Sequence, residues 1–506
     1  MLDKYWKHFK SGTDIRGVAA DGVAGEEIDL TNEAIEKMAK GFALWLKEAT
    51  KKEKLTVSVG HDSRISAERI KGVVIKALCD SGIDVIDCSL SSTPAMFMTT
   101  VKLECDGAVQ ITASHHPFNK NGLKFFTRGG GLEGSDIEAV LQNAQDGRFV
   151  EASAKGSIKE YNFMADYAND LCEMIKKGVN AEDYEKPLKN YHIIVDAGNG
   201  AGGFYAEKVL KPLGADIKGS QFLEPDGMFP NHIPNPENAV AMDFICKATV
   251  NNKADLGVIF DTDVDRAGCV DKSGNEINRN KLVALAAAIA LEGNEGGTIV
   301  TDSVTSSGLK TFIEEELGGK HLRFKRGYKN VINESIRLNK EGINSPLAIE
   351  TSGHAALKEN YFLDDGSYLI TKIIIKMANM GKEGKTLESL IEKLKQPVES
   401  KELRMNILTE DFAEYGNNVI KKLFEYAENQ EGWNVADDNH EGIRVSFGKG
   451  DGDGWFLLRL SVHDPIMPLN IESDVEGGNK IIAKKLYEFL KQFDKLKISC
   501  VEDFIK

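Results

Sequence analysis

Apolar runs of strand length recur along the chain, and each one ends in a polar or glycine-containing turn. Residues 106–111 and 256–260 predict buried strands, the second within a mostly parallel sheet. Further strands of this kind are expected at residues 55–59, 193–196 and 298–301. They alternate with amphipathic helical patterns, and their wide spacing indicates three similar α/β domains.

The last part of the chain has a different pattern. Beyond Lys401 we expect a helix, paired strands and a final helix, with residues 448–454 as a hairpin-like turn. Polar or glycine-containing stretches near residues 154–157, 272–275 and 396–400 are candidate boundaries. The predicted domains are therefore residues 1–156, 157–274, 275–397 and 398–506.

Composition narrows the class of protein. Of 506 residues, 42% are hydrophobic and 28% are charged, as in soluble globular proteins. The net charge of −15 argues against nucleic acid as a partner, and the longest apolar run, residues 282–291, is too short to span a membrane. Seven cysteines without a CxxC pair, and an N-terminus without a signal-peptide core, predict a cytoplasmic protein.

One serine stands where a loop can expose it for phosphoryl chemistry. Ser114 follows the strand at residues 106–111, and Pro117 disfavours a continuing helix. Two imidazoles, His115 and His116, flank it, and Lys124 follows shortly after. A solvated polar loop is the alternative interpretation of this segment.

Three carboxylates begin where the strand at residues 256–260 ends. Asp261, Asp263 and Asp265 would repel one another without a hard cation, and oxygen ligands suit Mg²⁺. Ligand sites in α/β sheets lie at such strand ends. An EF-hand is excluded, because Arg266 stands at the sixth loop position and Lys272 at the twelfth.

Two local motifs allow other functions. Residues 198–203 spell GxGxxG after a strand, and Asp216 lies where a dinucleotide-binding domain would place its ribose-binding acid. The aspartate loop also matches the opening motif of haloacid-dehalogenase-type phosphatases. In that class Asp261 would attack phosphorus and Asp263 would act as general acid.

The serine and aspartate loops, together with two later segments, resemble the α-D-phosphohexomutase superfamily. This superfamily includes phosphoglucomutases, phosphomannomutases and phosphoglucosamine mutases. The later segments are a sugar-binding loop at residues 350–354 and a phosphate-binding loop at residues 459–465. Smaller matches lie at residues 11–17, 60–64 and 225–232. The matches occur in the family's order and cover nearly the whole chain.

The resemblance implies both a fold and a reaction. The fold would be α/β, with three similar mixed α/β sandwich domains and a smaller α+β C-terminal domain around a central cleft. The enzyme would interconvert hexose 1-phosphate and hexose 6-phosphate of mannose, glucose or both. Phosphorylated Ser114 would carry the phosphoryl group, and hexose 1,6-bisphosphate would be intermediate and activator. Mg²⁺ would be held by Ser114, Asp261, Asp263 and Asp265.

The resemblance also implies roles for other residues. Arg266 would stabilise the transferring group. The general acid/base is Lys124, His115 or His354. Lys124 is favoured, because its place after the serine loop resembles that of the family's catalytic lysine. The expected substrate-binding residues are Arg16, Lys329, Glu350, Ser352, His354, Arg459, Ser461 and His463.

This chain departs from the family pattern in two loops. Ile349 replaces the usual glycine before Glu350, and the phosphate-binding loop has Leu460, Val462, His463 and Asp464 where the family has Pro, Gly, Thr and Glu. The changes leave the sugar open. The short opening at residues 14–17 favours the phosphomannomutase/phosphoglucomutase group over phosphoglucosamine mutases. A phosphatase and a non-catalytic sugar-phosphate-binding relative are the other function classes.

Overall fold

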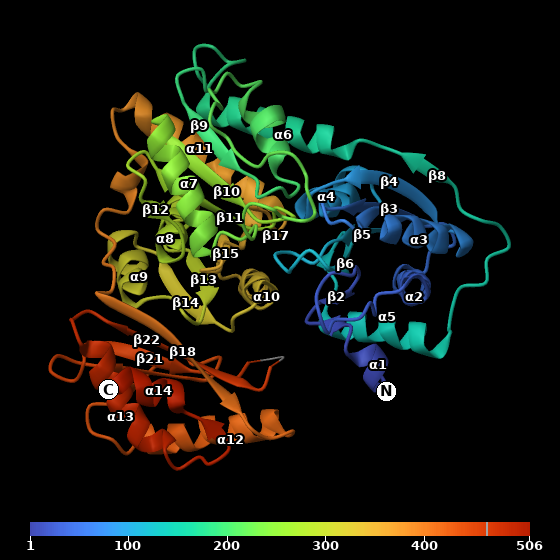
Figure 1. The fold of residues 1–506 in the computed structure, drawn as a ribbon. Coiled ribbons are helices and arrows are strands. Elements are labelled where there is room, and N and C mark those ends of the chain that lie inside the picture. Colours follow the sequence, from blue (N-terminus) through green and yellow to red (C-terminus); the bar gives the residue numbers. More distant parts are fainter. Residues whose placement is uncertain (462–463) are drawn as a thin grey trace. The chain divides into compact units, whose positions relative to one another are not determined.

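The computed structural model of the protein describes residues 1–461 and 464–506. The chain divides into two compact units. Unit 1 consists of Met1–Ile289 and Ser352–Leu390, and unit 2 consists of Ala290–Thr351 and Ile391–Lys506. Unit 1 contains the two N-terminal sheets, and unit 2 contains the C-terminal sheet (Figure 1).

The first sheet of unit 1 has eight strands. In sheet order they are β1 (Lys10–Ser11), β2 (Asp14–Val18), β6 (Lys120–Thr127), β5 (Gly107–Ile111), β3 (Thr56–His61), β4 (Asp84–Leu90) and β8 (Ile158–Glu160), with β7 (Gly130–Gly131) beside β6. Strands β5, β3, β4 and β8 are parallel, whereas β6 and β2 run antiparallel to their neighbours. Every residue of β5 is buried, as expected of a central strand covered on both faces.

Helices enclose this sheet. They are α1 (Lys4–Lys7), α2 (Asn32–Thr50), α3 (Ala67–Asp80), α4 (Thr93–Lys102) and α5 (Gly134–Asp146). In α2 the Thr31 side chain caps the N-terminus by accepting from the Ala34 N–H, and the buried residues recur at helical spacing. Figure 1 shows α2, α3 and α5 together in one layer.

The second sheet of unit 1 carries the aspartate loop. Its order is β12 (Glu276–Ile277), β11 (Ala267–Asp271), β10 (Leu256–Phe260) and β9 (Ile193–Asp196). Only β9 and β10 are parallel, so the prediction of a mostly parallel sheet here was wrong. The residues between β10 and β11 are too few for the crossover that a parallel pair needs, and the two strands form a hairpin.

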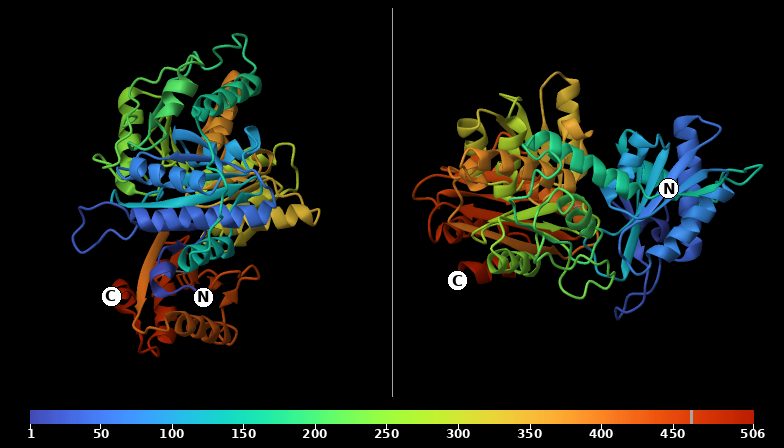
Figure 2. Two further views of the ribbon diagram at one scale, coloured as in Figure 1. Left: turned by 90° about the vertical axis from the view of Figure 1, so that its right-hand side faces the viewer. Right: turned by 90° about the horizontal axis from the view of Figure 1, so that it is seen from above.

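Four further helices belong to this part of unit 1. They are α6 (Phe163–Val179), the π-helix η1 (Tyr205–Leu210), α7 (Ala239–Asn252) and α8 (Asn280–Leu291), whose last residues belong to unit 2. Helix α6, drawn in teal-green in Figure 2, follows β8. It packs against η1. The glycine turn at residues 198–203 precedes η1, and a Cβ at Gly200 would lie 2.5 Å from the Thr262 carbonyl oxygen. This close approach gives the GxGxxG pattern a structural explanation.

The third group of strands belongs partly to each unit. In unit 2, β14 (Lys320–Phe324), β13 (Thr298–Asp302) and β15 (Leu347–Ile349) are parallel, with α9 (Ser307–Thr311), the π-helix η2 (Phe312–Glu316) and α10 (Tyr328–Lys340). In unit 1, β16 (Ala355–Leu357) and β17 (Leu363–Asp364) are antiparallel and lead to α11 (Gly366–Lys382). Short 3₁₀ turns lie at Lys358–Asn360 and Leu387–Leu390.

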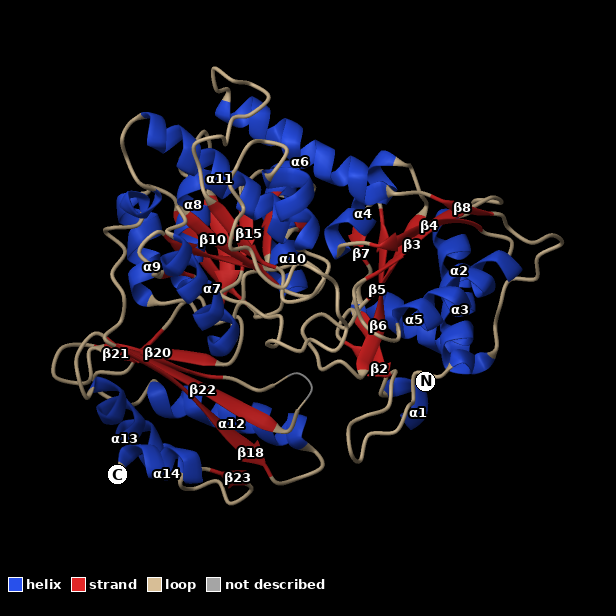
Figure 3. Ribbon diagram, turned by 45° about the horizontal axis from the view of Figure 1, so that its top comes forward, coloured by secondary structure: helices blue, strands red, loops and turns tan. Residues whose placement is uncertain are grey.

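The C-terminal sheet is antiparallel throughout. Its order is β19 (Asn434–Val435), β20 (Ile443–Phe447), β21 (Gly454–Leu458), β22 (Ile466–Ser473), β18 (Glu399–Ile407) and β23 (Leu496–Lys497). Helices α12 (Phe412–Ala427), α13 (Gly478–Leu490) and α14 (Ser499–Ile505) lie on one side of it (Figure 3). Their buried faces and the inward side of the sheet form one core.

The sequence patterns predicted this last domain only in part. The hairpin turn at residues 448–454 is confirmed between β20 and β21. The domain begins with β18 rather than a helix, and it ends with two helices rather than one. The missed signal for β18 is the alternation of buried Leu403, Met405 and Ile407 with more exposed polar residues.

Two further expectations concern cysteines and membranes. All seven cysteines are free thiols, and Cys269 is buried. Within the two described ranges, no helix combines the length and apolar character that crossing a bilayer requires.

Candidate active site

Ser114 lies just after β5, in unit 1, where the strand ends. It is buried, and its φ of 51° places it in the left-handed region, which costs a residue other than glycine about 1 kcal/mol or more. Its N–H donates to Thr112 Oγ1 at 2.9 Å. The predicted turn at a strand end is therefore present, and the surrounding structure holds the serine in an unusual backbone conformation.

Three groups surround the Ser114 hydroxyl. Arg266 Nη2 donates to Oγ at 3.0 Å, and Oγ donates to Asp261 Oδ2 at 3.4 Å. The His115 Nδ1 is 3.3 Å from Oγ and accepts a 2.6 Å hydrogen bond from Arg266. The hydroxyl therefore lies between a fixed cation and a carboxylate, where charge on a transferring phosphoryl group can be neutralised.

The three aspartates lie in the hairpin between β10 and β11. All are buried, and one oxygen from each lies within 4.8 Å of the others. Thr93, the first residue of α4, donates from Oγ1 to Asp263 Oδ2 at 2.5 Å and from its N–H to the Asp263 carbonyl at 2.8 Å. Helix α4 thus fixes the aspartate loop beside the serine loop.

Lys124 on β6 reaches the same carboxylates. Its Nζ lies 2.9 Å from Asp263 Oδ2 and 2.5 Å from Asp265 Oδ2, and its side chain is nearly buried. Register explains its place, because β6 pairs with β5 and sets Lys124 opposite Gln110, shortly before the strand gives way to the serine loop. A charge-assisted pair at this distance fixes the ammonium group within the centre.

Electrostatics differ among the aspartates. Burial and the charge of Asp265 raise the pKa of Asp261 well above its usual value, against the effect of Arg266. Burial also opposes the ionisation of Asp265, but Lys124, His354 and Arg266 hold its pKa well below the usual range. The negative charge of the loop therefore depends on the cations packed against it.

The two histidines of the serine loop are neutral near pH 7. Burial, followed by the charge of Arg266, lowers the pKa of His115 to about 2. Burial, followed by the charge of Arg16, lowers the pKa of His116 to about 3. The cations around Ser114 are therefore guanidinium and ammonium groups rather than imidazolium.

Arg16 on β2 is close enough for its charge to affect both histidines. Its Nη2 donates to Asp14 Oδ2 at 3.0 Å. Its Nε is buried and has no hydrogen-bond partner in residues 1–461 and 464–506. A buried N–H without an acceptor is costly, so this donor is suited to an anionic ligand.

His354 connects the sugar-loop segment to the aspartates. Its Nδ1 is 2.9 Å from Ser352 Oγ. Its Nε2 lies 3.6 Å from Asp265 Oδ1 and 3.6 Å from Asp364 Oδ2. A backbone bridge between His354 and Arg266 holds the two segments together. Unit 1 therefore brings together Ser114, His115, Lys124, Asp261, Asp263, Asp265, Arg266 and His354.

Glu350 lies in unit 2, directly after β15. Its Oε1 accepts a 2.6 Å hydrogen bond from the N–H of Gly327, which precedes α10, the helix that carries Lys329. Asp302 ends the neighbouring strand β13 and accepts from the Thr351 N–H and Oγ1. Burial and the charge of Glu350 raise the pKa of Asp302 to about 7.

Arg459 and Ser461 follow β21 in unit 2. The Arg459 Nη1 lies 3.7 Å from Glu441 Oε1, and its buried Nε has no hydrogen-bond partner within the described ranges. Glu441 Oε2 accepts from Ser303 Oγ at 2.6 Å and from the Arg326 N–H at 3.0 Å. The predicted contribution of His463 lies outside the described residues.

Three family profiles match successive parts of the chain. They describe the alpha/beta/alpha domains I, II and III of phosphoglucomutase/phosphomannomutase and match residues 10–151, 166–274 and 278–398. A phosphoglucomutase/phosphomannomutase from Thermococcus kodakarensis is 32% identical over 461 residues, which cover 90% of this chain and 93% of the relative. The chain belongs to the phosphoglucomutase/phosphomannomutase family.

Other relatives cover the chain to a similar extent. A phosphoglucomutase from Neisseria meningitidis is 30% identical, with 92% of this chain and 93% of the relative covered. Among solved structures, a family protein from Burkholderia thailandensis matches with a TM-score of 0.78 and 25% identity, covering 97% of this chain and 98% of that chain. The fold predicted from the resemblance is confirmed as three α/β domains followed by a further C-terminal domain.

The structure shows how the two loops that depart from the family pattern are held in place. Ile349 is the last residue of β15, is fully buried, and pairs with Thr301, so Glu350 begins its loop from a regular strand end. Leu460 packs on α12, because a Cβ at Gly416 would lie 2.5 Å from its Cδ1. Ser461 closes the loop by donating its N–H to the Ile466 carbonyl at 2.9 Å.

Sequence patterns missed several residues around these sites. Thr93 and Glu441 lie far along the chain from the groups they contact, and no local motif marks either one. Asp302 could have been found from the sequence, because it lies at the carboxyl end of an apolar strand, and Asp261 likewise follows such a strand directly. Arg326 lies three residues before Lys329, and its Nε lies 3.9 Å from Asp302 Oδ2.

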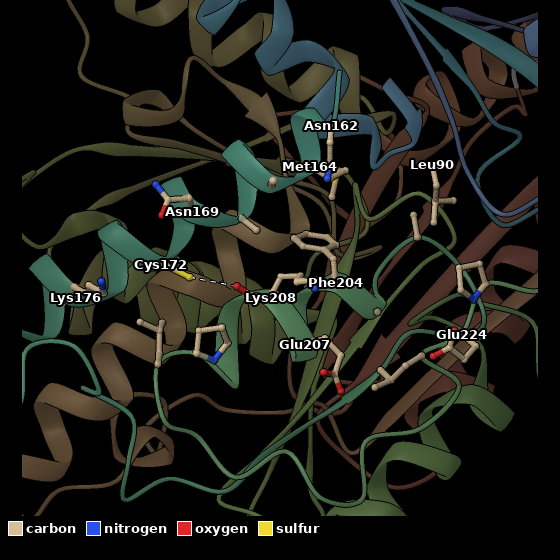
Figure 4. Close-up of a pocket in the computed structure, with 18 of the residues that line it drawn as sticks. Leu90, Asn162, Met164, Asn169, Cys172, Lys176, Phe204, Glu207, Lys208 and Glu224 are labelled. Atoms are coloured by element: carbon tan, nitrogen blue, oxygen red, sulfur yellow. Dashed lines mark hydrogen bonds between the residues drawn. The ribbon is translucent and has the colours of Figure 1, made fainter. Parts of the chain in front are cut away.

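A cavity of about 680 Å³ lies elsewhere in unit 1. It lies beside α6 and η1, where Cys172 donates to the Lys208 carbonyl oxygen at 3.4 Å (Figure 4). Met164 and Phe204 contribute apolar surface to it. None of the predicted site residues lines this cavity, so the candidate active site rests on the charged cluster around Ser114.

The aspartate cluster fits a hard divalent cation. Asp263 Oδ1 and Asp265 Oδ1 are buried and accept no hydrogen bond from residues 1–461 and 464–506. Their other oxygens are held by Lys124, and Asp261 adds a further carboxylate within reach. An all-oxygen donor set with free buried lone pairs is what Mg²⁺ prefers.

Proposed function

We propose that the protein is a phosphohexomutase that interconverts the 1-phosphate and 6-phosphate of mannose, glucose or both. The single observation that carries the proposal is the placement of Ser114 Oγ between Arg266 and Asp261 in a buried centre. Family membership and the names of the relatives agree with it. The substrates are those of the phosphomannomutase/phosphoglucomutase relatives, and glucosamine phosphate is the alternative substrate.

The proposed reaction has two balanced transfers. Phosphorylated Ser114 gives its phosphoryl group to the free hydroxyl of a hexose monophosphate, so a bond to the sugar oxygen forms as the bond to Oγ breaks. The hydroxyl proton passes to a base. The resulting 1,6-bisphosphate reorients, and Ser114 Oγ then takes the other phosphoryl group. Arg266, which already donates a hydrogen bond to Oγ, neutralises the charge on the oxygens of the transferring group in both steps.

Asp261, Asp263 and Asp265, together with a phosphoryl oxygen on Ser114, would hold Mg²⁺. When bound, the ion would supply charge neutralisation at the phosphoryl group. Lys124 and Thr93 orient the carboxylates through Oδ2 and leave Oδ1 of Asp263 and Asp265 available. This arrangement supports a resident cation rather than an attacking Asp261.

Lys124 remains the preferred general acid/base. Its Nζ lies inside the charged centre, beside two of the carboxylates. His354 is the second candidate, because Ser352 and Asp265 orient its ring. His115 is less suited, since its Nδ1 already accepts a hydrogen bond from Arg266. Proton transfer requires a group within hydrogen-bond reach of the sugar hydroxyl, and Lys124 as a neutral amine would accept the hydroxyl proton in the first transfer and return it in the second.

The distal phosphate and the sugar would be held by the residues of the two later loops and by Arg16. The buried Nε groups of Arg459 and Arg16 have no hydrogen-bond partner among residues 1–461 and 464–506, which supports anion binding at both positions. Glu350 and Ser352 would bind sugar hydroxyls, with Lys329, Ser461 and His463 completing the set of substrate ligands. Hexose 1,6-bisphosphate would load the enzyme as its activator.

Phosphorus NMR tests the proposal. The protein is incubated with Mg²⁺, glucose 1-phosphate or mannose 1-phosphate, and a trace of the matching 1,6-bisphosphate. A growing 6-phosphate signal without inorganic phosphate is expected. Inorganic phosphate as product would instead identify a phosphatase. If no product forms with either sugar or with glucosamine 1-phosphate, the protein would be a non-catalytic sugar-phosphate-binding relative.

A further inference from the structure

Arg64 lies inside the turn that carries the proposed nucleophile. It is 2% exposed and belongs to the short motif at residues 60–64, to which the proposed reaction gives no role. Its Nη1 donates to the carbonyl oxygens of Pro117 at 2.7 Å and Lys120 at 2.9 Å. Its Nη2 donates to those of Ser114 and His116. One guanidinium group thus satisfies four carbonyls of the loop.

Asp62 connects the same guanidinium group to the other side of Ser114. The Arg64 Nε lies 3.3 Å from Asp62 Oδ2, and Thr112 Oγ1 donates to that oxygen at 2.7 Å. The Ser114 N–H in turn donates to Thr112 Oγ1 at 2.9 Å. Both the N–H and the carbonyl group of Ser114 are therefore fixed by one buried ion pair, directly or through Thr112.

A loop from the second sheet's domain covers the outer side of Arg64. The Phe229 ring centroid lies 5.2 Å from the Arg64 Cζ, within the range of a cation–π contact. A Cβ at Gly227 would lie 2.4 Å from the Ser63 carbonyl oxygen, so this position has no room for a side chain. The segment at residues 225–232, another motif with no role in the proposed reaction, thus closes the environment of Arg64.

The chemistry of the site requires arginine. Four carbonyl groups of one turn accept from this guanidinium group, and a buried carbonyl that loses its donor is costly. A planar guanidinium group offers five N–H donors in a rigid fork, whereas an ammonium group offers three at one point. The left-handed backbone of Ser114 is unfavourable in itself and persists only when its surroundings determine it from both sides.

We propose that the Asp62–Arg64 pair is a positioning element for phosphoryl transfer. It holds the Ser114 backbone so that Oγ stays at the junction of Arg266 and Asp261 in both transfers. This inference rests on the proposed function. Because Arg64 hydrogen-bonds loop carbonyls behind the nucleophile, its loss affects the rate of transfer more than the binding of substrate.

Arg64→Lys is the first test, and Arg69→Lys is its matched control. Arg69 in α3 also donates to backbone carbonyls, those of Ala19 and Leu30, but not to the serine loop. For Arg64→Lys, kcat and the rate of Ser114 phosphorylation by hexose 1,6-bisphosphate should fall about 100-fold while KM stays nearly constant. For Arg69→Lys, only thermal stability should fall.

Chemical rescue separates positioning from general stability. Ethylguanidinium at non-denaturing concentration should restore part of kcat to Arg64→Ala, because it can donate to the same carbonyls. It should leave the kcat of Arg69→Ala unchanged. Equal responses of the two variants, or recovery of melting temperature without recovery of kcat, would overturn the inference.

Thr112→Val provides a second route if the Arg64 variants do not fold. It keeps the side-chain shape and removes the link between the Ser114 N–H and Asp62. A fall in kcat of about tenfold at unchanged KM is expected, and wild-type kcat would refute positioning.

The two proposals can fail separately. If the wild type itself has no mutase activity, both the proposed function and the inference that rests on it are refuted. If the wild type is active and Arg64→Lys is equally active, only the inference fails.

Discussion

The charged cluster of unit 1 and that of unit 2 are balanced in different ways. Around Ser114, buried carboxylates and cations pair at short distances, with Lys124 on two aspartates and Arg266 on a third. In unit 2, Arg459 lies 3.7 Å from Glu441 and keeps an Nε without a hydrogen-bond partner among the described residues. The first cluster is tightly organised, and the second retains capacity to bind an anion.

This difference assigns the two regions to different kinetic steps. Fixed, desolvated charges stabilise a transition state, because they need no reorganisation as charge moves. A cation whose N–H donor has no partner is instead suited to binding an anionic substrate. Changes at the residues that contact Ser114 or the three aspartates should therefore act mainly on kcat, whereas changes around Arg459 should act mainly on KM.

The largest expected effect is that of Ser114→Ala. It removes the proposed phosphoryl carrier while Arg266 and the aspartates stay in place, so mutase turnover should fall by about 10⁴-fold or more. The NMR assay measures the loss. Asp261→Asn is the companion variant, because a phosphatase acting through Asp261 would lose turnover in that variant alone and keep it in Ser114→Ala.

Removal of the proposed cation site should have the next largest effect. Asp263→Asn should lower kcat by about 10³-fold, since a carboxylate ligand is lost and Lys124 loses one partner. Added Mg²⁺ should raise the melting temperature of the wild type but not of this variant. A chelator should stop wild-type turnover. Equal Mg²⁺ stabilisation of both proteins would show that the ion binds elsewhere.

Arg459→Lys tests the other side of the comparison. The ammonium group keeps the charge but lacks the guanidinium fork, so KM should rise by about 10-fold to 100-fold while kcat changes little. Steady-state kinetics with either sugar 1-phosphate gives both values. A fall in kcat with constant KM would place Arg459 in the transfer step and remove the distinction between the clusters.

The pH dependence of binding should follow Asp302. Its pKa is raised to about 7, so above that pH it adds a second negative charge beside Glu350 and opposes phosphate binding. KM should rise between pH 6.5 and 8.5 in the wild type, and Asp302→Asn should reduce the rise. Because the folded-state pKa exceeds the usual value, this group's contribution to stability is full at low pH and decreases as pH rises through 7. An unchanged KM profile in the variant would refute this role.

The smallest effect is expected for Glu441→Gln. The change removes the charge opposite Arg459 and keeps an oxygen that can accept from Ser303 and the Arg326 N–H. KM should fall about threefold, the size of one partly exposed ion pair. Glu414→Gln, on the exposed side of α12, is the control and should leave KM unchanged. A rise in KM for Glu441→Gln would show that the carboxylate supports Arg459 instead of competing for it.

Local sequence patterns predicted the elements that present the chemistry. The strands before Ser114 and Asp261, and the turns that follow them, are visible in a few consecutive residues. The mixed second sheet was missed, because pairing direction depends on where the chain returns and an apolar run does not show it. Strand β18 was missed although its alternating pattern was visible.

The candidate site was predictable where a motif holds the residues proposed to react. Ser114, Lys124 and the aspartates were found this way, and the structure brings them together. Supporting contacts were not predictable in the same way. Arg64 binds carbonyls about fifty residues away, and backbone acceptors leave no mark in a sequence.

Mass spectrometry of the phosphorylated protein tests the central claim most directly. The wild type and Ser114→Ala are incubated with Mg²⁺ and hexose 1,6-bisphosphate, then measured intact and after digestion. One phosphoryl group on the peptide that contains Ser114, transferable to added hexose monophosphate and missing from the variant, is the expected result. A phosphoryl group on the peptide that contains Asp261, or equal labelling of both proteins, would contradict the account.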